Sequence, residues 1–257
     1  KKRGWSLPRA NTPLSSGCRP ESDISAELDA TDAAHCQFLI GMLRWVTELG
    51  RVNMCLEVSM MSSHMAAPRI GHLQQLMHMI AYLKKVPKLT LVFDPRHPEI
   101  DKQRFDVHDW HDFYRDAKEE IPHDLPPPRR HEVSMHCFVG ANHASNLSNR
   151  RSQTGVLIFL NRAPILWYSK RQSTVESSTF GSEFVAMKIA VEMIQGLRYK
   201  LRTFGIPINK PTNIFCDNEA VCKNTRLPHS TLNKKHNAIA YHKYREAVAV
   251  GMIRIAK

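Results

Sequence analysis

The stretch TGVLIFLNRAPILWYSKRQSTVESSTFGSEFVAMKIAVEMIQGLRYKLRT, residues 154–203, decides the fold of this chain. It begins with two β-rich runs joined by a tight turn at Asn161 and Arg162. A long helix is expected from about Thr179 to Thr203, because apolar residues recur there at helical spacing. Two strands followed by a long helix predict an α/β domain.

Regular elements continue on both sides of this stretch. The expected strands are residues 133–139, 154–160, 164–169, 212–216 and 252–256, and shorter helices are expected after Asp217 and near residues 232–249. Three strands, a helix, a strand, helices and a last strand predict a mixed five-stranded sheet with flanking helices.

The first half of the chain is expected to be mostly helical. After an extended arm, the pattern predicts helices near residues 32–50 and 71–85 and a short strand at residues 89–93. The expected buried faces hold Phe38, Leu39, Met42, Leu43, Trp45, Val46 and Leu49 on the first helix, and Leu73, Leu76, Met77, Ile80 and Leu83 on the second.

A proline-rich linker and a change of charge divide the chain. The prolines of DLPPPRRHE, residues 124–132, disfavour regular structure, so we expect two domains, residues 1–124 and 125–257. The first holds 16 Lys and Arg against 17 Asp and Glu, whereas the second holds 20 against 7, a net charge of +13. A domain that carries the whole positive excess predicts a polyanionic partner, although a solvated basic surface is the simpler alternative.

Cysteine and histidine spacing argues against a zinc-finger site. The cysteines are Cys18, Cys36, Cys55, Cys137, Cys216 and Cys222, and they form no CxxC pair. No histidine joins a cysteine at zinc-finger spacing, so reduced core cysteines of an intracellular protein, cytoplasmic or nuclear, are expected. No run approaches the roughly 20 apolar residues of a membrane span, and no apolar leader opens the chain, so neither membrane insertion nor secretion is expected.

Two carboxylates stand where a metal site on a sheet would need them. Asp217 follows an expected strand, and Glu183 lies in the first turns of the long helix with Phe180 and Met187 on its apolar side. Asp217 could instead cap a helix, and Glu183 could be an acid favoured near a helix N-terminus. Together on a basic domain they suggest a phosphodiester site in which carboxylates hold two Mg²⁺ ions.

Ordered motifs give the chain a family resemblance. RRSQTG, WYSKRQ, SSTFGSEF, CDN and KKHNAIAYHKYRE resemble the ribonuclease H domain of copia-type long-terminal-repeat retrotransposon polyproteins, in the order and at the spacing of that family. Upstream, FLIGMLRWVTELGRVNM and LVFDP are similar to the end of the reverse transcriptase and its connection to the nuclease. The resemblance covers essentially the whole chain. It implies a ribonuclease H-like sheet preceded by a small, mostly helical reverse transcriptase thumb or connection segment.

The resemblance also implies roles for individual residues. Glu183 and Asp217 correspond to two catalytic, metal-binding carboxylates and are expected within about 8 Å of each other, because both would bind ions roughly 4 Å apart. In the first-strand motif the bridging aspartate falls on Gly140 and the next on Asn142. The family's last carboxylate falls after Lys257, and its paired polymerase aspartates fall before Lys1. We therefore expect Mg²⁺ binding to be weak or absent and polymerase activity to be absent.

The basic residues have their own expected role. The residues expected to contact nucleic acid are Arg150, Arg151, Lys170, Arg171, Lys234, Lys235, His236 and Lys243, with Arg245 and His242 as further phosphate contacts. Tyr241 and Trp167 could pack against sugar or base, although buried aromatic packing is the commoner role. An RNA–DNA hybrid would be bound through its shape and backbone.

Three functions are compatible with these residues. The first is a retrotransposon-derived fragment that binds RNA–DNA hybrid or other nucleic acid and has lost most or all Mg²⁺-dependent hydrolysis of the RNA strand. The second is a working ribonuclease H of a live element, which could also associate with the upstream reverse transcriptase portion. The third is a co-opted nucleic-acid-binding protein without enzymatic activity.

Overall fold

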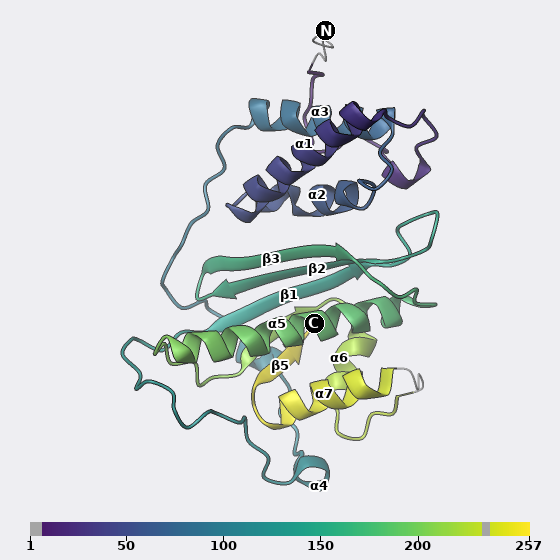
Figure 1. Cartoon of the computed structure of the whole chain (residues 1–257). Coiled ribbons are helices and arrows are strands. Elements are labelled where there is room, and N and C mark those ends of the chain that lie inside the picture. Colours follow the sequence, from purple (N-terminus) through teal and green to yellow (C-terminus); the bar gives the residue numbers. More distant parts are fainter. Residues whose placement is uncertain (1–6, 233–236) are drawn as a thin grey trace. The chain divides into compact units, whose positions relative to one another are not determined.

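The chain forms two compact units in a computed structural model that describes residues 7–232 and 237–257. The first unit comprises residues 1–91, 144–153 and 168–175, and the second comprises residues 92–143, 154–167 and 176–257. Helices α1, α2 and α3 form the body of the first unit, and helices α5, α6 and α7 accompany the sheet in the second (Figure 1).

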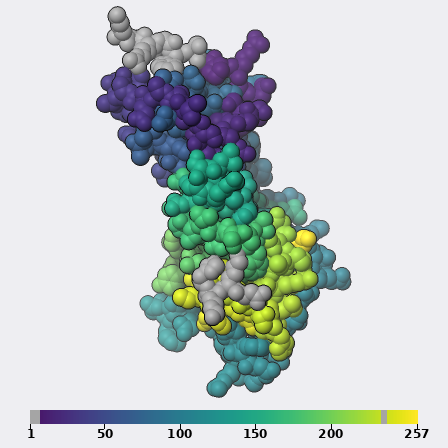
Figure 2. All heavy atoms as spheres, turned by 90° about the vertical axis from the view of Figure 1, so that its right-hand side faces the viewer, coloured from purple at the N-terminus to yellow at the C-terminus, as the bar shows by residue number. Residues whose placement is uncertain are grey.

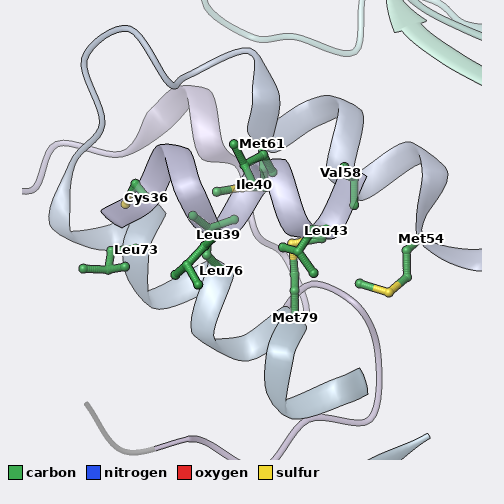
Figure 3. Close-up of a cluster of buried hydrophobic side chains, with 10 residues drawn as sticks. All are labelled: Cys36, Leu39, Ile40, Leu43, Met54, Val58, Met61, Leu73, Leu76 and Met79. Atoms are coloured by element: carbon green, nitrogen blue, oxygen red, sulfur yellow. The ribbon is translucent and has the colours of Figure 1, made fainter. Parts of the chain in front are cut away.

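The first unit is built around a small helical core. Its helices are α1 (Ala30–Glu48), α2 (Cys55–Ser62) and α3 (Ile70–Lys85), with short 3₁₀ turns η1 (Pro20–Ser22) and η2 (Val52–Met54). Helix α1 begins at Asp29, whose side chain accepts a hydrogen bond from the backbone N–H of Asp32. The core side chains drawn in Figure 3 are Cys36, Leu39, Ile40, Leu43, Met54, Val58, Met61, Leu73, Leu76 and Met79.

The buried face of α1 differs from the predicted one. Leu39 and Leu43 are buried as expected, but Phe38, Met42, Trp45 and Leu49 are exposed, Trp45 to 66%. The stripe toward α2 and α3 runs instead through Cys36, Ile40 and Thr47. Apolar residues surround most of this helix, so their spacing predicts a helix without deciding which side of it is covered.

The second unit contains the body of one five-stranded sheet. Its strands are β1 (Met135–Asn142), β2 (Gln153–Leu160), β3 (Ala163–Arg171), β4 (Thr212–Cys216) and β5 (Ile253–Ala256), in the order β3-β2-β1-β4-β5. Neighbouring strands β2 and β3 are joined by the predicted two-residue turn, where Asn161 has a φ of 54°. Such a short connection makes this pair antiparallel, whereas β1, β4 and β5 run parallel.

Helix α5 (Thr179–Thr203) packs on the central strand β1. It begins at Ser178, whose hydroxyl accepts a hydrogen bond from the Gly181 N–H at 3.2 Å. It ends before Gly205, which adopts a φ of 70° that favours glycine. The other helices of this unit are α6 (Glu219–Arg226), α7 (Ala238–Ala249), the single-turn α4 (His111–Tyr114) and the 3₁₀ turn η3 (Lys102–Arg104).

The predicted fold class is confirmed: the chain has a ribonuclease H-like mixed five-stranded sheet with flanking helices, preceded by a small helical segment. The short strand predicted at residues 89–93 is wrong. These residues form no strand, and Leu89, Val92 and Phe93 are exposed. A strand needs a neighbouring strand to pair with. Without one, the backbone N–H and C=O groups of this apolar run hydrogen-bond to water instead.

The acidic segment before the linker belongs to the second unit. Phe105 and Trp110 are buried there, and the Phe105 ring packs edge-on against Phe215 of β4 at a centroid distance of 5.7 Å. Figure 2 shows the teal atoms of this segment flanking the yellow atoms of the C-terminal helices. Residues 92–124 therefore fold with the sheet, although they precede the proline-rich linker in sequence.

Glu119 connects this segment to α5. Its carboxylate accepts paired hydrogen bonds from Arg198, at 3.0 and 2.7 Å, and from Arg202, at 2.8 and 2.7 Å. Arg198 is fully buried and also donates to the carbonyls of Ile208 and Lys210. Burial raises the pKa of Glu119, but the hydrogen bonds from Arg202 and Arg198 outweigh it and lower that pKa to about 2.

Among the described helices, none combines the length and the apolar character needed to cross a lipid bilayer.

Candidate metal centre

The candidate site lies at one end of the paired strands β1 and β4. Val139 and Cys216 are partners in the parallel register, so Gly140 and Asp217 both follow that pair at the same edge of the sheet. The carboxyl ends of neighbouring parallel strands are a common place for a ligand site. Glu183, in the second turn of α5, faces this edge because α5 packs on β1.

Three possible metal ligands meet there. One carboxylate oxygen of Glu183, one of Asp217 and the thiol sulfur of Cys216 all lie within 4.8 Å of one another. Glu183 and Asp217 are therefore as close as the family resemblance predicts. Glu183 and Cys216 are buried, whereas Asp217 is exposed, so the site opens to solvent on the Asp217 side.

Gly140 faces Glu183 directly. Apart from its two chain neighbours, a Cβ atom built on Gly140 would meet, among the described residues, the Oε2 atom of Glu183 alone within 4 Å, at 3.8 Å. Gly140 lies inside β1 rather than just after it, because the strand continues to Asn142. The glycine thus leaves side-chain space open at the position where the resemblance places a bridging aspartate.

The neighbours of Gly140 do not replace the missing carboxylate. Asn142 is exposed at the end of β1. The Nδ1 atom of His143 lies 3.2 Å from the hydroxyl of Ser182. Among the His, Cys, Asp and Glu residues of the described chain, the cluster that could hold a metal ion contains Glu183, Cys216 and Asp217 but not His143.

Glu183 is an unusual carboxylate for a folded protein. Its side chain is only 7% exposed, and its Oε2 atom has no hydrogen-bond partner within the described part of the chain. Burial raises the pKa of Glu183, a backbone hydrogen bond from Ala141 lowers it, and the nearby charge of Asp217 raises it, so the pKa lies above its ordinary value. A buried anion without a full set of partners costs stability, which is typical of a functional site.

Cys216 is the ligand that the sequence prediction missed. A thiol at the end of a strand is typical of a core cysteine, and Cys216 is indeed buried. The available signal was its position, directly before Asp217 at a strand end. A hydrogen bond with the Cys222 thiol and burial together raise the pKa of Cys216 above its ordinary value.

The alternative role of Asp217 as a helix cap is wrong. Helix α6 is capped by the next residue, Asn218, whose side-chain oxygen accepts a hydrogen bond from the N–H of Val221 at 3.2 Å. Asp217 therefore has no capping role, and its carboxylate points toward Glu183 and Cys216.

These residues do not fit a pair of Mg²⁺ ions. Mg²⁺ requires oxygen ligands in octahedral geometry, and two ions at close range need a carboxylate shared between them. Glu183 and Asp217 supply two carboxylates, Gly140 supplies none, and the third donor is a sulfur atom. The donor set is sufficient for one cation.

The residues predicted to bind nucleic acid are divided between the two units. Arg150, Arg151, Lys170 and Arg171 lie in the first unit, exposed or half-buried, and Lys243 lies in the second. The ammonium group of Lys243 is 3.2 Å from Glu192. Lys234, Lys235 and His236 lie outside the described residues.

Arg245 is not a phosphate contact, contrary to the prediction. It is buried, donates to the carbonyl of Leu227 and the hydroxyl of Ser230, and stacks 5.0 Å from the ring centre of Trp110 and 4.7 Å from that of Tyr241. Tyr241 is buried in the same cluster. The position of Arg245 on a basic helix predicted that its charge would be exposed. In the structure, aromatic residues of the 92–124 segment cover the Arg245 side chain.

The two units of the structure divide the net charge more evenly than the two halves of the sequence do. By formal count, the first unit holds 15 Lys and Arg against 7 Asp and Glu, and the second holds 21 against 17. Their net charges are therefore +8 and +4. The acidic segment 92–124 offsets much of the positive charge of the domain onto which it folds, while Arg150, Arg151, Lys170 and Arg171 add to the first unit.

Comparisons with known proteins support the family resemblance. The chain is 23% identical over 236 residues to the "Retrovirus-related Pol polyprotein from transposon RE1" of Arabidopsis thaliana, which covers 92% of this chain and 14% of the relative. It is 28% identical over 123 residues to that of transposon RE2, covering 48% of this chain and 8% of the relative. It is 27% identical over 120 residues to that of transposon TNT 1-94 of Nicotiana tabacum, covering 47% and 9%. The predicted resemblance to Pol polyproteins of copia-type transposons is confirmed, and the chain spans 14% or less of the length of these relatives.

Solved structures similar to the chain are ribonucleases H. LC11-RNase H1 in complex with an RNA/DNA hybrid aligns with a TM-score of 0.38 and 12% identity, covering 48% of this chain and 83% of that one. The N-terminal RNase H domain of rv2228c from Mycobacterium tuberculosis aligns with a TM-score of 0.34 and 8% identity, covering 49% and 78%. No protein-family model matches the chain.

Proposed function

We propose that this chain is the reverse transcriptase end and ribonuclease H part of a Pol polyprotein, that it binds RNA–DNA hybrid, and that it has lost hydrolysis of the RNA strand. Residues 125–257 then derive from the ribonuclease H domain, and residues 1–124 from the reverse transcriptase and its connection. The plant transposon Pol relatives support this origin, because one of them aligns with 92% of the chain.

The observation that carries the loss of hydrolysis is the place of Gly140. Two cations about 4 Å apart repel each other, and a shared carboxylate is what makes that spacing tolerable. At the edge of the sheet next to Glu183 and Asp217, the residue in the bridging position has no side chain. One cation held by the remaining carboxylates cannot stabilise both the attacking and the leaving oxygen.

Hybrid binding is supported by charge. Both units are positively charged by formal count, and the first is the more positive although it is mostly outside the ribonuclease H domain. A polyanion that contacts lysine and arginine releases counterions, so its affinity depends steeply on salt. We place part of the contact surface at Arg150, Arg151, Lys170 and Arg171, and part at Lys234, Lys235, His236 and Lys243.

A cleavage assay tests the catalytic half of the proposal. The full chain is incubated with Mg²⁺ or Mn²⁺ and a hybrid labelled on the RNA strand, and no cleavage is expected. Gly140→Asp should increase Mg²⁺ binding, because the open space beside Glu183 accepts the added carboxylate, whereas Gly140→Asn, with the same shape and no charge, should not. Cleavage by the unmodified chain that stops in Glu183→Gln would show that catalysis has been retained.

A binding titration tests the other half. Affinity of the full chain for hybrid, measured at increasing salt, should fall linearly on logarithmic axes. Replacing Arg150 and Arg151 with Ala should reduce the slope by up to about one unit for each phosphate that the variant no longer binds. Replacing Lys84 and Lys85 with Ala removes the same charge from the exposed end of α3 and should leave the slope unchanged. Salt-independent affinity would refute polyanion binding.

A further inference from the structure

We propose that Glu183, Cys216 and Asp217 bind a single thiophilic divalent cation, Zn²⁺ or its analogue Co²⁺, in preference to Mg²⁺. This inference does not depend on hybrid binding or on the loss of hydrolysis, because it concerns the donor atoms alone. The site, which has no carboxylate at Gly140, would then bind a cation other than Mg²⁺.

The donor set matches such a cation in chemistry. Two carboxylate oxygens and one sulfur atom lie within 4.8 Å of one another. Zn²⁺ accepts both Cys sulfur, at about 2.3 Å, and carboxylate oxygen, at about 2.0–2.2 Å, and three protein ligands plus one water complete its tetrahedron. On metal binding the Cys216 thiol releases its proton to solvent, and the thiolate that remains is a soft ligand that selects Zn²⁺ over Mg²⁺. The three donors need to approach by about 1 Å for those bond lengths, a movement within reach of the exposed Asp217 side chain.

A second observation points into the same space. Glu183 is more than nine-tenths buried, and its Oε2 atom has no hydrogen-bond partner within the described residues. That atom also lies 3.8 Å from a Cβ built on Gly140, so it faces the open position beside β1. A cation beside Asp217 would supply the partner that this oxygen lacks, and the bonds it forms would offset the cost of burying the carboxylate.

Gly140 shifts the preference further from Mg²⁺. An octahedral ion bound through two carboxylates needs four further oxygen ligands, and water would have to provide them beside a buried sulfur atom. A tetrahedral ion needs one further ligand, and the solvent at the exposed Asp217 can supply a water molecule. Loss of the bridging carboxylate therefore favours the cation with the smaller coordination number.

Cys222 offers a matched control for Cys216. Both thiols are buried and only six residues apart, and the Cys222 sulfur donates to the carbonyl of Cys216 at 3.5 Å. Cys222 lies outside the group of converging donors. A serine at either position removes one sulfur atom from the same small region. Serine at position 222 keeps a hydroxyl donor for the Cys216 carbonyl, so only loss of the Cys216 sulfur should abolish cation binding.

The test titrates Co²⁺ alone into the reduced full chain and follows the near-ultraviolet thiolate-to-cobalt charge-transfer band. We expect one equivalent to produce the band, Cys216→Ser to lose it and Cys222→Ser to keep it. Zn²⁺ should displace Co²⁺, whereas excess Mg²⁺ should not. Persistence of the band in Cys216→Ser, or its loss in Cys222→Ser instead, would overturn the assignment.

A surface variant keeps the test decisive if a buried serine prevents folding. Asp217 is exposed, so Asp217→Asn should fold normally and weaken Co²⁺ binding by more than about tenfold, since loss of an outer partner alone costs roughly 10–100-fold. Glu219→Gln removes a half-exposed carboxylate, paired with Lys223, two residues away and should leave affinity unchanged. Equal affinity for Co²⁺ in Asp217→Asn and the unmodified chain would exclude the site, whatever the result of the hybrid assays.

Discussion

Helix α5 carries two contrasting carboxylate environments, one near each end. Near its C-terminal end, Arg198 and Arg202 hold Glu119 through four hydrogen bonds and lower its pKa. Near its N-terminal end, Glu183 is buried beside a second carboxylate, has an oxygen without a partner in the described part of the chain, and has a raised pKa. Complete pairing is what a structural contact needs, whereas an incompletely paired buried anion indicates a place that a ligand can occupy.

Removing the Glu119 charge, which pairs with Arg198 and Arg202, should cause the largest loss of stability. Glu119→Gln leaves the fully buried Arg198 without its counter-charge, and removal of one partner of a buried ion pair typically costs about 3–5 kcal/mol. We expect a loss of about 3 kcal/mol in the free energy of unfolding by urea denaturation. Glu120→Gln, at the exposed neighbouring residue, should change it by less than about 0.5 kcal/mol. Equal effects of the two variants would contradict a structural role for the Glu119 cluster.

Removing the Glu183 charge should change the free energy of unfolding in the opposite direction and by a smaller amount. Glu183→Gln removes a buried, incompletely partnered charge and should stabilise the metal-free protein by about 1 kcal/mol at pH 7. A thermal denaturation series at neutral pH measures it. A destabilised Glu183→Gln variant would mean that the Glu183 carboxylate is satisfied in the native state.

The two carboxylates should also differ in the direction of their pH dependence. The native pKa of Glu119, about 2, is below the ordinary 4.5, so its contribution is full above pH 4.5 and is lost as pH falls toward 2. The native pKa of Glu183 is raised, so the unfolded state ionises first and stability falls as pH rises above 4.5. The stability difference between each Gln variant and the unmodified chain, measured against pH, should therefore change in opposite directions.

The smallest expected effect isolates the charge of Asp217. Asp217→Asn should lower the pKa of Glu183, because the Asp217 charge raises it. Carboxyl chemical shifts followed by NMR during a pH titration measure the change, and Glu219→Gln, farther along α6, serves as control. An unaltered Glu183 pKa in Asp217→Asn would mean that burial alone sets its value.

Local patterns predicted the sheet and the long helix well. The expected bounds of α5 and β4 agree with the structure, because helical periodicity, the Ser178 cap and β-rich composition act over a few residues. The closeness of Glu183 and Asp217 followed from the family resemblance, and a carboxylate oxygen of each lies within 4.8 Å of the other.

Contacts between distant residues could not be predicted in the same way. Glu119 and Arg198 are 79 residues apart, and nothing near either residue indicates the other. Arg245 has the sequence context of a surface charge, but Trp110 covers it. The sequence around Cys216 is typical of a core thiol. Glu183, one of the two carboxylates that meet it, lies on a separate helix, so the local sequence does not indicate a shared site. Each error concerns which surfaces meet, which tertiary packing decides.

The ionic cluster around Glu119 also bears on where this chain can be joined to a related sequence. The proline-rich linker at residues 124–132 looks like a natural crossover point, since few backbone hydrogen bonds would be cut there. A crossover at that point would nevertheless inherit Glu119 from one parent and Arg198 and Arg202 from the other. Chimaeras joined near residue 92 keep all three from one parent. Where the parents differ at these positions, chimaeras that fold should have their junctions upstream of the acidic segment.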